Sequence, residues 1–175
     1  LRAGTIEPMF VLGIDPGLSR CGFAVVEKLG RQTEAVTLGV IRTPPKDPIP
    51  KRLALLQTEV RALIQEFKPE AVALERVFFQ VNVKTAIGVA QASGIAMAEA
   101  IAHGAEVAEY TPNQIKEAVG GWGAADKKQI QKMVQTLLQL PSLPTPADAA
   151  DAAATALCHI AHMSMQKIET ASRNK

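Results

Sequence analysis

Short apolar runs separated by turn residues dominate the first quarter of the chain. Residues 11–15, 22–27 and 33–41 are rich in β-branched and other apolar side chains, and short segments with Gly or polar residues separate them. Connections this short join antiparallel neighbours, so the pattern predicts a three-stranded meander. A loop with four prolines between residues 44 and 50 follows the third run.

Helical spacing of apolar residues then replaces the short runs. Leu53, Leu56, Val60, Leu63, Ile64 and Phe67 would form one apolar face of a helix that stops before Pro69. Two further runs, residues 71–75 and 106–110, predict short strands. Further helices are expected over residues 82–103, 112–120, 126–138 and from Thr145 to about Gln166.

This order of elements predicts an α/β fold. An antiparallel meander followed by a parallel β-α-β-α-β unit gives a mixed five-stranded sheet flanked by helices. The length of 175 residues suits one domain. We expect that domain to span residues 9–168, with residues 1–8 as an added or disordered leader before a natural start at Met9, and residues 169–175 as a disordered tail.

Composition narrows the function classes only slightly. Hydrophobic residues make up 47% and charged residues 21%, which is ordinary for a soluble globular protein. A net charge of +2 permits a nucleic-acid partner without arguing for one. Two distant cysteines exclude a disulfide framework and a cysteine-based zinc site. The sequence contains no run of 18 consecutive apolar residues and so predicts no membrane span. We expect a cytoplasmic protein with reduced thiols.

Four carboxylates form the main candidate site. Asp15 and Glu75 each end a predicted strand, and Asp148 and Asp151 are three residues apart at the start of the last helix. Ligands of open α/β sheets gather outside the carboxyl ends of parallel strands. If the last helix begins against that edge of the sheet, all four side chains converge.

Converging carboxylates repel one another and need protons or cations. Hard divalent ions with oxygen ligands are the natural cations, and two Mg²⁺ roughly 3.5–4 Å apart can activate water and stabilise the leaving oxygen of a phosphodiester. No protein nucleophile is needed for that chemistry, and the sequence shows no Ser/His/Asp spacing.

Each acid also has a simpler interpretation. Asp15 stands before a Pro-Gly turn, Glu75 could be solvated at a strand end, and Asp148 could cap the last helix. Only Asp151, a turn further into an alanine-rich helix, calls for a partner by itself. The joint placement of the four therefore carries more weight than any one of them.

Five motifs resemble those of the RuvC Holliday junction resolvases, in the same order and over nearly the whole chain. They are VLGIDPG (11–17), LERVF (74–78), QASG (91–94), QIKEAVGG (114–121) and ADAADA (147–152). The resemblance implies a ribonuclease H-like fold, a homodimer, and Mg²⁺-dependent cutting of two strands of like polarity at a four-way DNA junction. It also implies the RuvAB branch-migration complex as a partner.

The resemblance assigns roles to single residues as well. It makes Asp15, Glu75, Asp148 and Asp151 the catalytic metal ligands, for Mg²⁺ or for Mn²⁺ as a substitute, with His also accepted in the family at position 148. Phe78 matches an aromatic residue that presses on bases near the crossover. Lys116 and Lys127 match basic residues that hold DNA.

Further DNA contacts are expected from charge. Lys127 and Lys128 open a helix, where a positive charge opposes the helix dipole and a phosphate would relieve the conflict. A solvated charged face explains Lys128 equally well. Lys84 is a further candidate, and the small residues of the 82–103 helix suggest a dimer contact.

Three other functions are compatible with parts of this pattern. A non-catalytic protein could bind four-way junctions without needing the acidic cluster. A nuclease of a related fold could act on structured RNA. An actin-like phosphotransferase also has an acidic turn after its first strand, but it needs two copies of the fold around a cleft.

Overall fold

The computed structural model describes the backbone of residues 7–76, 83–121 and 123–173, and the side chains of this set apart from residues 83–84 and 166–173. Its five strands form one mixed sheet in the order β3-β2-β1-β4-β5. The first three strands are antiparallel neighbours, whereas β1, β4 and β5 are parallel. The strands are β1 (Met9–Asp15), β2 (Arg20–Leu29), β3 (Gln32–Arg42), β4 (Ala71–Glu75) and β5 (Glu106–Tyr110). The predicted sheet is thereby confirmed.

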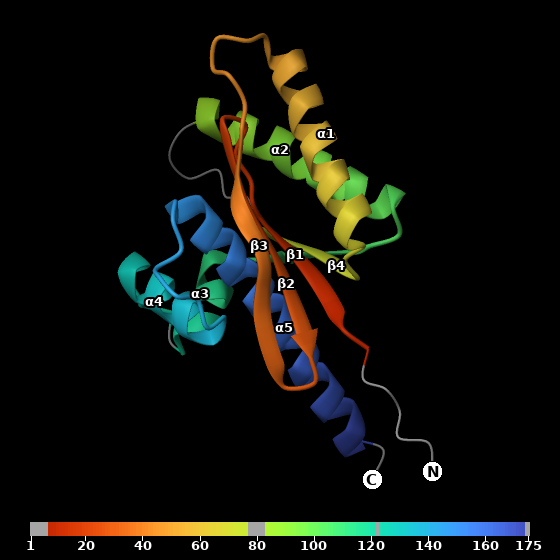
Figure 1. Ribbon diagram of the computed structural model, residues 1–175, viewed down its shortest axis with the longest axis vertical. Helices are drawn as coiled ribbons and strands as arrows, with labels where there is room; N and C mark the ends of the chain where they lie inside the picture. Colours follow the sequence, from red (N-terminus) through yellow and green to blue (C-terminus); the bar gives the residue numbers. More distant parts are fainter. Residues whose placement is uncertain (1–6, 77–82, 122, 174–175) are drawn as a thin grey trace.

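Helices cover both faces of this sheet. Helices α1 and α2 lie on one face, and α3, α4 and α5 lie on the other (Figure 1). They are α1 (Ile49–Phe67), α2 (Val83–Ala102), α3 (Pro112–Gly120), α4 (Lys127–Leu137) and α5 (Ala147–Arg173).

The two cores follow from the alternation of side chains along the strands. On β1, Val11 belongs to the core under α5, and its neighbour Leu12 belongs to the core under α1 and α2. On β4, Ala73 and Val72 divide in the same way, and all four residues are fully buried. Successive strand residues point to opposite faces, so central strands covered on both sides are apolar throughout.

Two glycines let α5 lie directly on the sheet. A Cβ atom added to Gly13 of β1 would be 2.0 Å from the backbone oxygen of Ala152. One added to Gly22 of β2 would be 2.0 Å from the backbone oxygen of Asp148. Because these positions lack side chains, the first turns of α5 lie against the strand that ends in Asp15.

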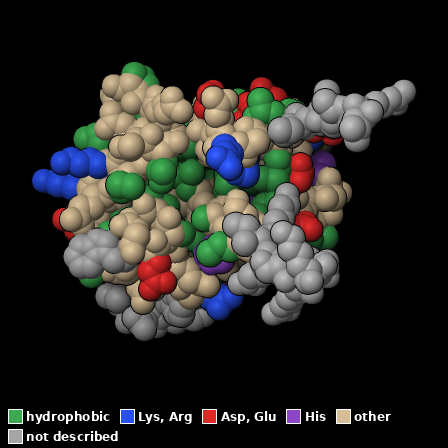
Figure 2. Space-filling model, turned by 90° about the horizontal axis from the view of Figure 1, so that it is seen from below, with side chains coloured by type: hydrophobic (Ala, Val, Ile, Leu, Met, Phe, Trp, Pro, Cys, Tyr) green, Lys and Arg blue, Asp and Glu red, His purple; other side chains and the backbone are tan. Residues whose placement is uncertain are grey.

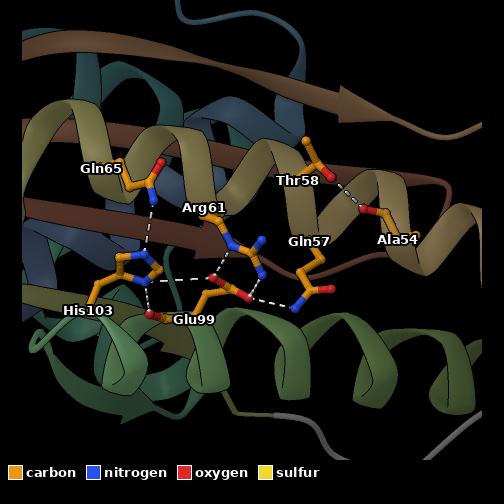
Figure 3. A network of polar contacts seen from close by, with 7 residues as sticks. All are labelled: Ala54, Gln57, Thr58, Arg61, Gln65, Glu99 and His103. Atoms are coloured by element: carbon orange, nitrogen blue, oxygen red, sulfur yellow. Dashed lines mark hydrogen bonds and ion pairs between the residues drawn. The ribbon is translucent and has the colours of Figure 1, made fainter.

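A buried carboxylate joins α1 to α2 on the opposite face. Glu99 of α2 is 4% exposed and accepts hydrogen bonds from Arg61 Nε (2.9 Å) and Nη2 (2.8 Å) and from Gln57 Nε2 (2.6 Å) (Figure 3). His103 Nδ1 is 3.7 Å from Glu99 Oε2. The Arg61 hydrogen bond is the largest influence on the Glu99 carboxyl and lowers its pKa to about 2. The charge is therefore fully compensated within the fold.

Two element boundaries differ from the expectation by more than two residues. Helix α1 begins at Ile49, inside the expected proline-rich loop, because Pro50 stands in its first turn, where a missing N–H costs no hydrogen bond. Helix α5 extends to Arg173, past Gln166, and so includes residues 169–173 of the expected tail.

One segment of the described chain, Thr85–Ala102 of α2, is long and apolar enough to cross a membrane by length and composition alone. Its mean hydropathy is 1.3, and 28% of the segment is buried. Core helices pass the same test, so this is weak evidence for a membrane. Its inner face, with Ala92, Ala96 and Ala100, packs on the sheet.

The end of the molecule that carries both termini has no dominant charge. Among the coloured side chains, Lys, Arg, Asp and Glu are scattered there around hydrophobic groups (Figure 2). This mixture agrees with the small net charge of +2.

Candidate active site

The four predicted carboxylates line one pocket of about 510 Å³. Asp15, Glu75, Asp148 and Asp151 share its wall with Lys116 and Lys127. The acids come from three distant stretches of the chain, so only the folded protein brings them together.

Sheet register places the first two acids side by side. Strands β1 and β4 are parallel neighbours with Ile14 opposite Leu74, so Asp15 and Glu75 end adjacent strands at the same edge. Helix α5 contributes Asp148 from its first turn and Asp151 three residues later, on the same helix face. The contacts of α5 at Gly13 and Gly22 hold that turn against this edge of the sheet.

Burial and mutual repulsion disfavour negative charge on the two strand acids. The pKa of Asp15 is raised to about 7, mainly by burial and then by the charges of Asp151, Glu75 and Asp148. Burial and the charge of Asp151 also raise the pKa of Glu75, against the opposing influence of Lys127 and Lys116. The pocket therefore lacks the positive charge needed to keep all four groups ionised.

The chain supplies cations to the two helix acids. Arg20 Nε donates a hydrogen bond to Asp148 Oδ2 at 3.0 Å, and Arg20 Nη2 contacts the same oxygen. Lys127 Nζ donates to Asp151 Oδ2 at 2.8 Å. Among the residues that the structure describes, no Lys, Arg or His forms an ion pair with Asp15 or Glu75.

Two capped helices present the lysines to the pocket. Asp126 caps α4 and Gln129 closes a capping box with it, so Lys127 is the first helical residue. Thr111 and Gln114 form the same arrangement at α3, which carries Lys116. The caps fix where each helix begins and therefore where each lysine is placed.

The donor set fits hard divalent cations. All four acidic groups are carboxylates, the ligand type that Mg²⁺ and Mn²⁺ prefer. Burial and the neighbouring acids disfavour the negative charge of Asp15, and a bound cation would compensate that charge. In the described part of the chain, no three Asp, Glu, His or Cys side chains are arranged to hold an ion as they stand. Asp148 and Asp151 are instead paired with Arg20 and Lys127.

The structure does not place the other expected DNA-contacting residues, Lys128, Lys84 and Phe78, at the acidic pocket. Lys128 is exposed on α4 and is not among the residues that line the acidic pocket. Lys84 lies in the first turn of α2, but its side chain and the whole of Phe78 lie outside the described residues.

Sequence reasoning missed Arg20. Its position just after the Asp-Pro-Gly turn was the only available signal, and that signal does not distinguish it from any exposed arginine at a strand start. Its pairing with Asp148 joins residues 128 positions apart and exists only in the folded chain.

Comparison with known proteins identifies the family. The family model "Crossover junction endodeoxyribonuclease RuvC" matches residues 11–159. The chain belongs to the RuvC family. It is 47% identical over 135 residues to the Syntrophomonas wolfei protein of that name, covering 77% of this chain and 78% of the relative. A Salinispora arenicola protein of the same name is 51% identical over 133 residues, covering 75% and 76% of the two chains.

A solved structure supports both the family and the fold. The structure of Thermus thermophilus RuvC in complex with Holliday junction substrate superimposes with a TM-score of 0.86 at 35% identity, covering 90% of this chain and 96% of the other. The ribonuclease H-like fold expected from the motifs is thereby confirmed. Nucleases of the RuvC family depend on divalent metal ions.

Proposed function

We propose that this RuvC-family chain is a Holliday junction resolvase that hydrolyses phosphodiester bonds in two strands of like polarity at a four-way DNA junction. The observation that carries the proposal is the gathering of Asp15, Glu75, Asp148 and Asp151 into one pocket of a family member. Resolution of such junctions is a step of homologous recombination and DNA repair.

The four carboxylates would hold the metal ions, and two Mg²⁺ per site suit their number, with Mn²⁺ as a substitute. When bound, divalent ions supply an activated water and stabilise negative charge on the phosphodiester. Burial is the main cause of the raised pKa of Asp15, and repulsion from the other carboxylates adds to it. A bound cation would compensate the charge of Asp15 and remove that repulsion, which favours cation binding.

Lysines around the pocket would hold the DNA backbone. Lys116 and Lys127 lie on the wall beside the acids, where each can meet a phosphate of the bound strand. Lys128 and Lys84 would extend this contact along the DNA arms. We assign Phe78, from its motif, to stacking against bases near the crossover.

We further infer a homodimer formed through α2. The outer face of this helix carries a stripe of exposed apolar or small residues, namely Ile87, Ala90, Gly94, Ala98 and Ile101. Ile87 is 50% and Ile101 66% exposed, and a Cβ on Gly94 would meet nothing within 4 Å. A two-fold axis through such a stripe would pair two sites for two symmetric strands.

A dimer bound to a four-way junction would share that DNA with the protein complex that drives branch migration. We therefore propose the RuvAB branch-migration complex as a partner, and the cytoplasm, where chromosomal DNA is available, as the location. A pull-down of RuvAB with this chain on an immobilised junction tests the partnership, and no retention above a linear-duplex control would contradict it.

An end-labelled synthetic junction tests the activity. We expect paired nicks with Mg²⁺, none in EDTA, and loss of cutting with retained binding in Asp15→Asn or Glu75→Gln. Undiminished cutting in EDTA would rule out the metal mechanism. Junction binding without any cutting under Mg²⁺ or Mn²⁺ would favour the scaffold function, and preferential cutting of structured RNA would favour an RNA nuclease.

Light scattering tests the dimer. We expect twice the 18.6 kDa chain mass for the unaltered protein and a monomer for Gly94→Arg, which puts a long charged side chain in the middle of the stripe. Val36→Arg, at an apolar position of β3 that is 43% exposed, is the matched control and should leave the mass unchanged.

A further inference from the structure

Arg20 stands at the boundary between two hollows. It begins β2, and its guanidinium contacts Asp148, which lines the acidic pocket. Arg20 itself lines a second hollow of about 480 Å³ together with Leu18, Ser19 and Arg52. Arg20 therefore borders a second hollow that Asp148 does not line, which leaves space for its side chain to move.

Both nitrogen contacts of Arg20 use one carboxylate oxygen. Nε and Nη2 each reach Asp148 Oδ2, an oxygen of one of the proposed metal ligands. A guanidinium on that oxygen and a divalent ion on the same oxygen would repel each other at close range. The two cations therefore compete for Asp148.

The pair is also exposed enough to exchange. The Arg20 side chain is 42% and the Asp148 side chain 28% exposed, and an ion pair in this setting contributes little net free energy. Arginine binds phosphate oxygens through parallel hydrogen bonds as readily as it binds carboxylate oxygens. A DNA phosphate close to the pocket can therefore take over the guanidinium.

We propose that Arg20 is a positioning residue that acts as a replaceable counterion. In the absence of DNA it neutralises Asp148 and opposes metal binding. When a junction binds, its guanidinium transfers to a phosphate of the bound strand and leaves Asp148 free for the metal. The role rests on the proposed function, because it presumes that Asp148 is a metal ligand and that DNA enters this pocket.

Arg52, which lines the second hollow together with Arg20, has different hydrogen-bond partners from Arg20. Its Nε donates to Thr43 Oγ1 at 2.9 Å, and its Nη2 reaches Ser19 Oγ at 2.5 Å. These neutral partners tie Arg52 to the loop after β1, through Ser19, and to the residue after β3, Thr43, whereas Arg20 is bound to an acid of the site. Within the described residues, Arg20 is thus the arginine whose release would change the charge of the pocket.

Calorimetric titration of Ca²⁺ into the DNA-free protein tests the competition without any cleavage. We expect Arg20→Gln to bind Ca²⁺ about ten-fold more tightly than the unaltered protein, because the competing cation is gone. If Arg20 only oriented Asp148 as a ligand, the same change would weaken Ca²⁺ binding. The sign of the effect therefore separates a counterion from a merely structural residue.

Arg42→Gln is the matched control. Arg42 is exposed and lies opposite Arg20 in the β2–β3 register, so its loss removes the same charge one strand away. Ca²⁺ affinity should stay within two-fold of the unaltered value in this variant. An equal gain in both variants would overturn the counterion role, since net charge alone would then explain it.

Salt dependence of junction binding, measured in Ca²⁺, tests the second half of the exchange. Loss of one phosphate contact should reduce the slope of log affinity against log salt by about one in Arg20→Gln, and Arg20→Lys should restore most of it. An unchanged slope would overturn the transfer to DNA. If neither the unaltered protein nor Arg20→Gln binds Ca²⁺, with or without a junction, the metal-dependent function fails too, whereas tight Ca²⁺ binding that Arg20→Gln does not strengthen overturns the counterion role alone.

Discussion

Glu99 and Asp15 are both acids in sheltered positions, yet the fold treats them in opposite ways. Glu99, between α1 and α2, receives hydrogen bonds from Arg61 and Gln57, and its pKa falls to about 2 (Figure 3). Asp15, at the end of β1, is buried beside three other carboxylates, and burial first and their charges second raise its pKa to about 7. One charge is satisfied by the chain and the other is not.

This difference is the one expected between a structural acid and a proposed metal ligand. A satisfied carboxylate contributes to the packing of α1 on α2 and needs nothing from solution. An acid whose neighbours raise its pKa is stabilised by an added cation, which is the property expected of a metal site. The location of uncompensated charge, rather than burial alone, marks the candidate site.

The largest expected effect comes from exchanging the two acids for neutral residues. Asp15→Asn should reduce junction cutting at least about a thousand-fold, since metal-bound chemistry supplies several kcal/mol of transition-state stabilisation. Glu99→Ala should leave cutting nearly unchanged and lower the free energy of unfolding by about 1–2 kcal/mol, because Arg61 can return partly to water. Cleavage assays and urea denaturation of both variants would check this. A comparable loss of cutting in both variants would contradict the different roles assigned to Asp15 and Glu99.

Adding a methyl group under α5 should both destabilise the fold and disturb the acidic pocket. Gly13→Ala places its Cβ 2.0 Å from a backbone oxygen of α5, so we expect at least about 2 kcal/mol of destabilisation. Cutting should also fall, because α5 carries Asp148 and Asp151. In Gly39→Ala the added Cβ would meet only the Phe23 ring, at 2.9 Å, and the loss should be smaller in urea denaturation. Equal losses of unfolding free energy in the two variants would show that the close approach of α5 to Gly13 does not set the cost of the added methyl group.

The pH dependence of stability should differ in sign for the two acids. Asp15 has a folded-state pKa of about 7, above its ordinary 3.8, so the metal-free fold loses stability as pH rises from about 4 to 7. Asp15→Asn should remove this loss, of the order of 1–3 kcal/mol. Glu99 has a lowered pKa, so its contribution is present above pH 4.5 and disappears toward pH 2.

Urea denaturation of both proteins between pH 5 and 8 would measure the Asp15 effect. The buried His159 has a lowered pKa and acts in the opposite direction, losing its contribution as pH falls below 6.5. It is present in both proteins, so the difference between them isolates Asp15. Parallel stability curves across this range would contradict the assignment.

The smallest expected effect is a proton released on metal binding. The pKa of Asp15 is raised to about 7, so near neutral pH part of the Asp15 side chains should hold a proton that a cation must displace, and fewer should at higher pH. Calorimetry with Ca²⁺ in buffers of different ionisation enthalpy would count the protons. Glu99→Gln should release the same number as the unaltered protein, and release that does not depend on pH would contradict the raised pKa of Asp15.

The strands and helices of this protein could be predicted from the sequence because each depends mainly on residues close together in the chain. The runs that end in Asp15 and Glu75 are apolar throughout since β1 and β4 are covered on both faces, and the Thr111-Pro112 cap marks the start of α3. Strand pairing followed from short connections and from the right-handed parallel crossover. Five motifs then indicated the family that the comparisons confirm.

Only the tertiary structure decided how charge is distributed in the site. The pairing of Arg20 with Asp148 and of Lys127 with Asp151 joins residues 128 and 24 positions apart, and the compensation of Glu99 by Arg61 spans 38. A sequence determines which residues can ionise and which elements carry them. Whether a carboxylate meets a guanidinium or another carboxylate depends on distances across the fold, and Coulomb interactions change steeply over those few ångströms.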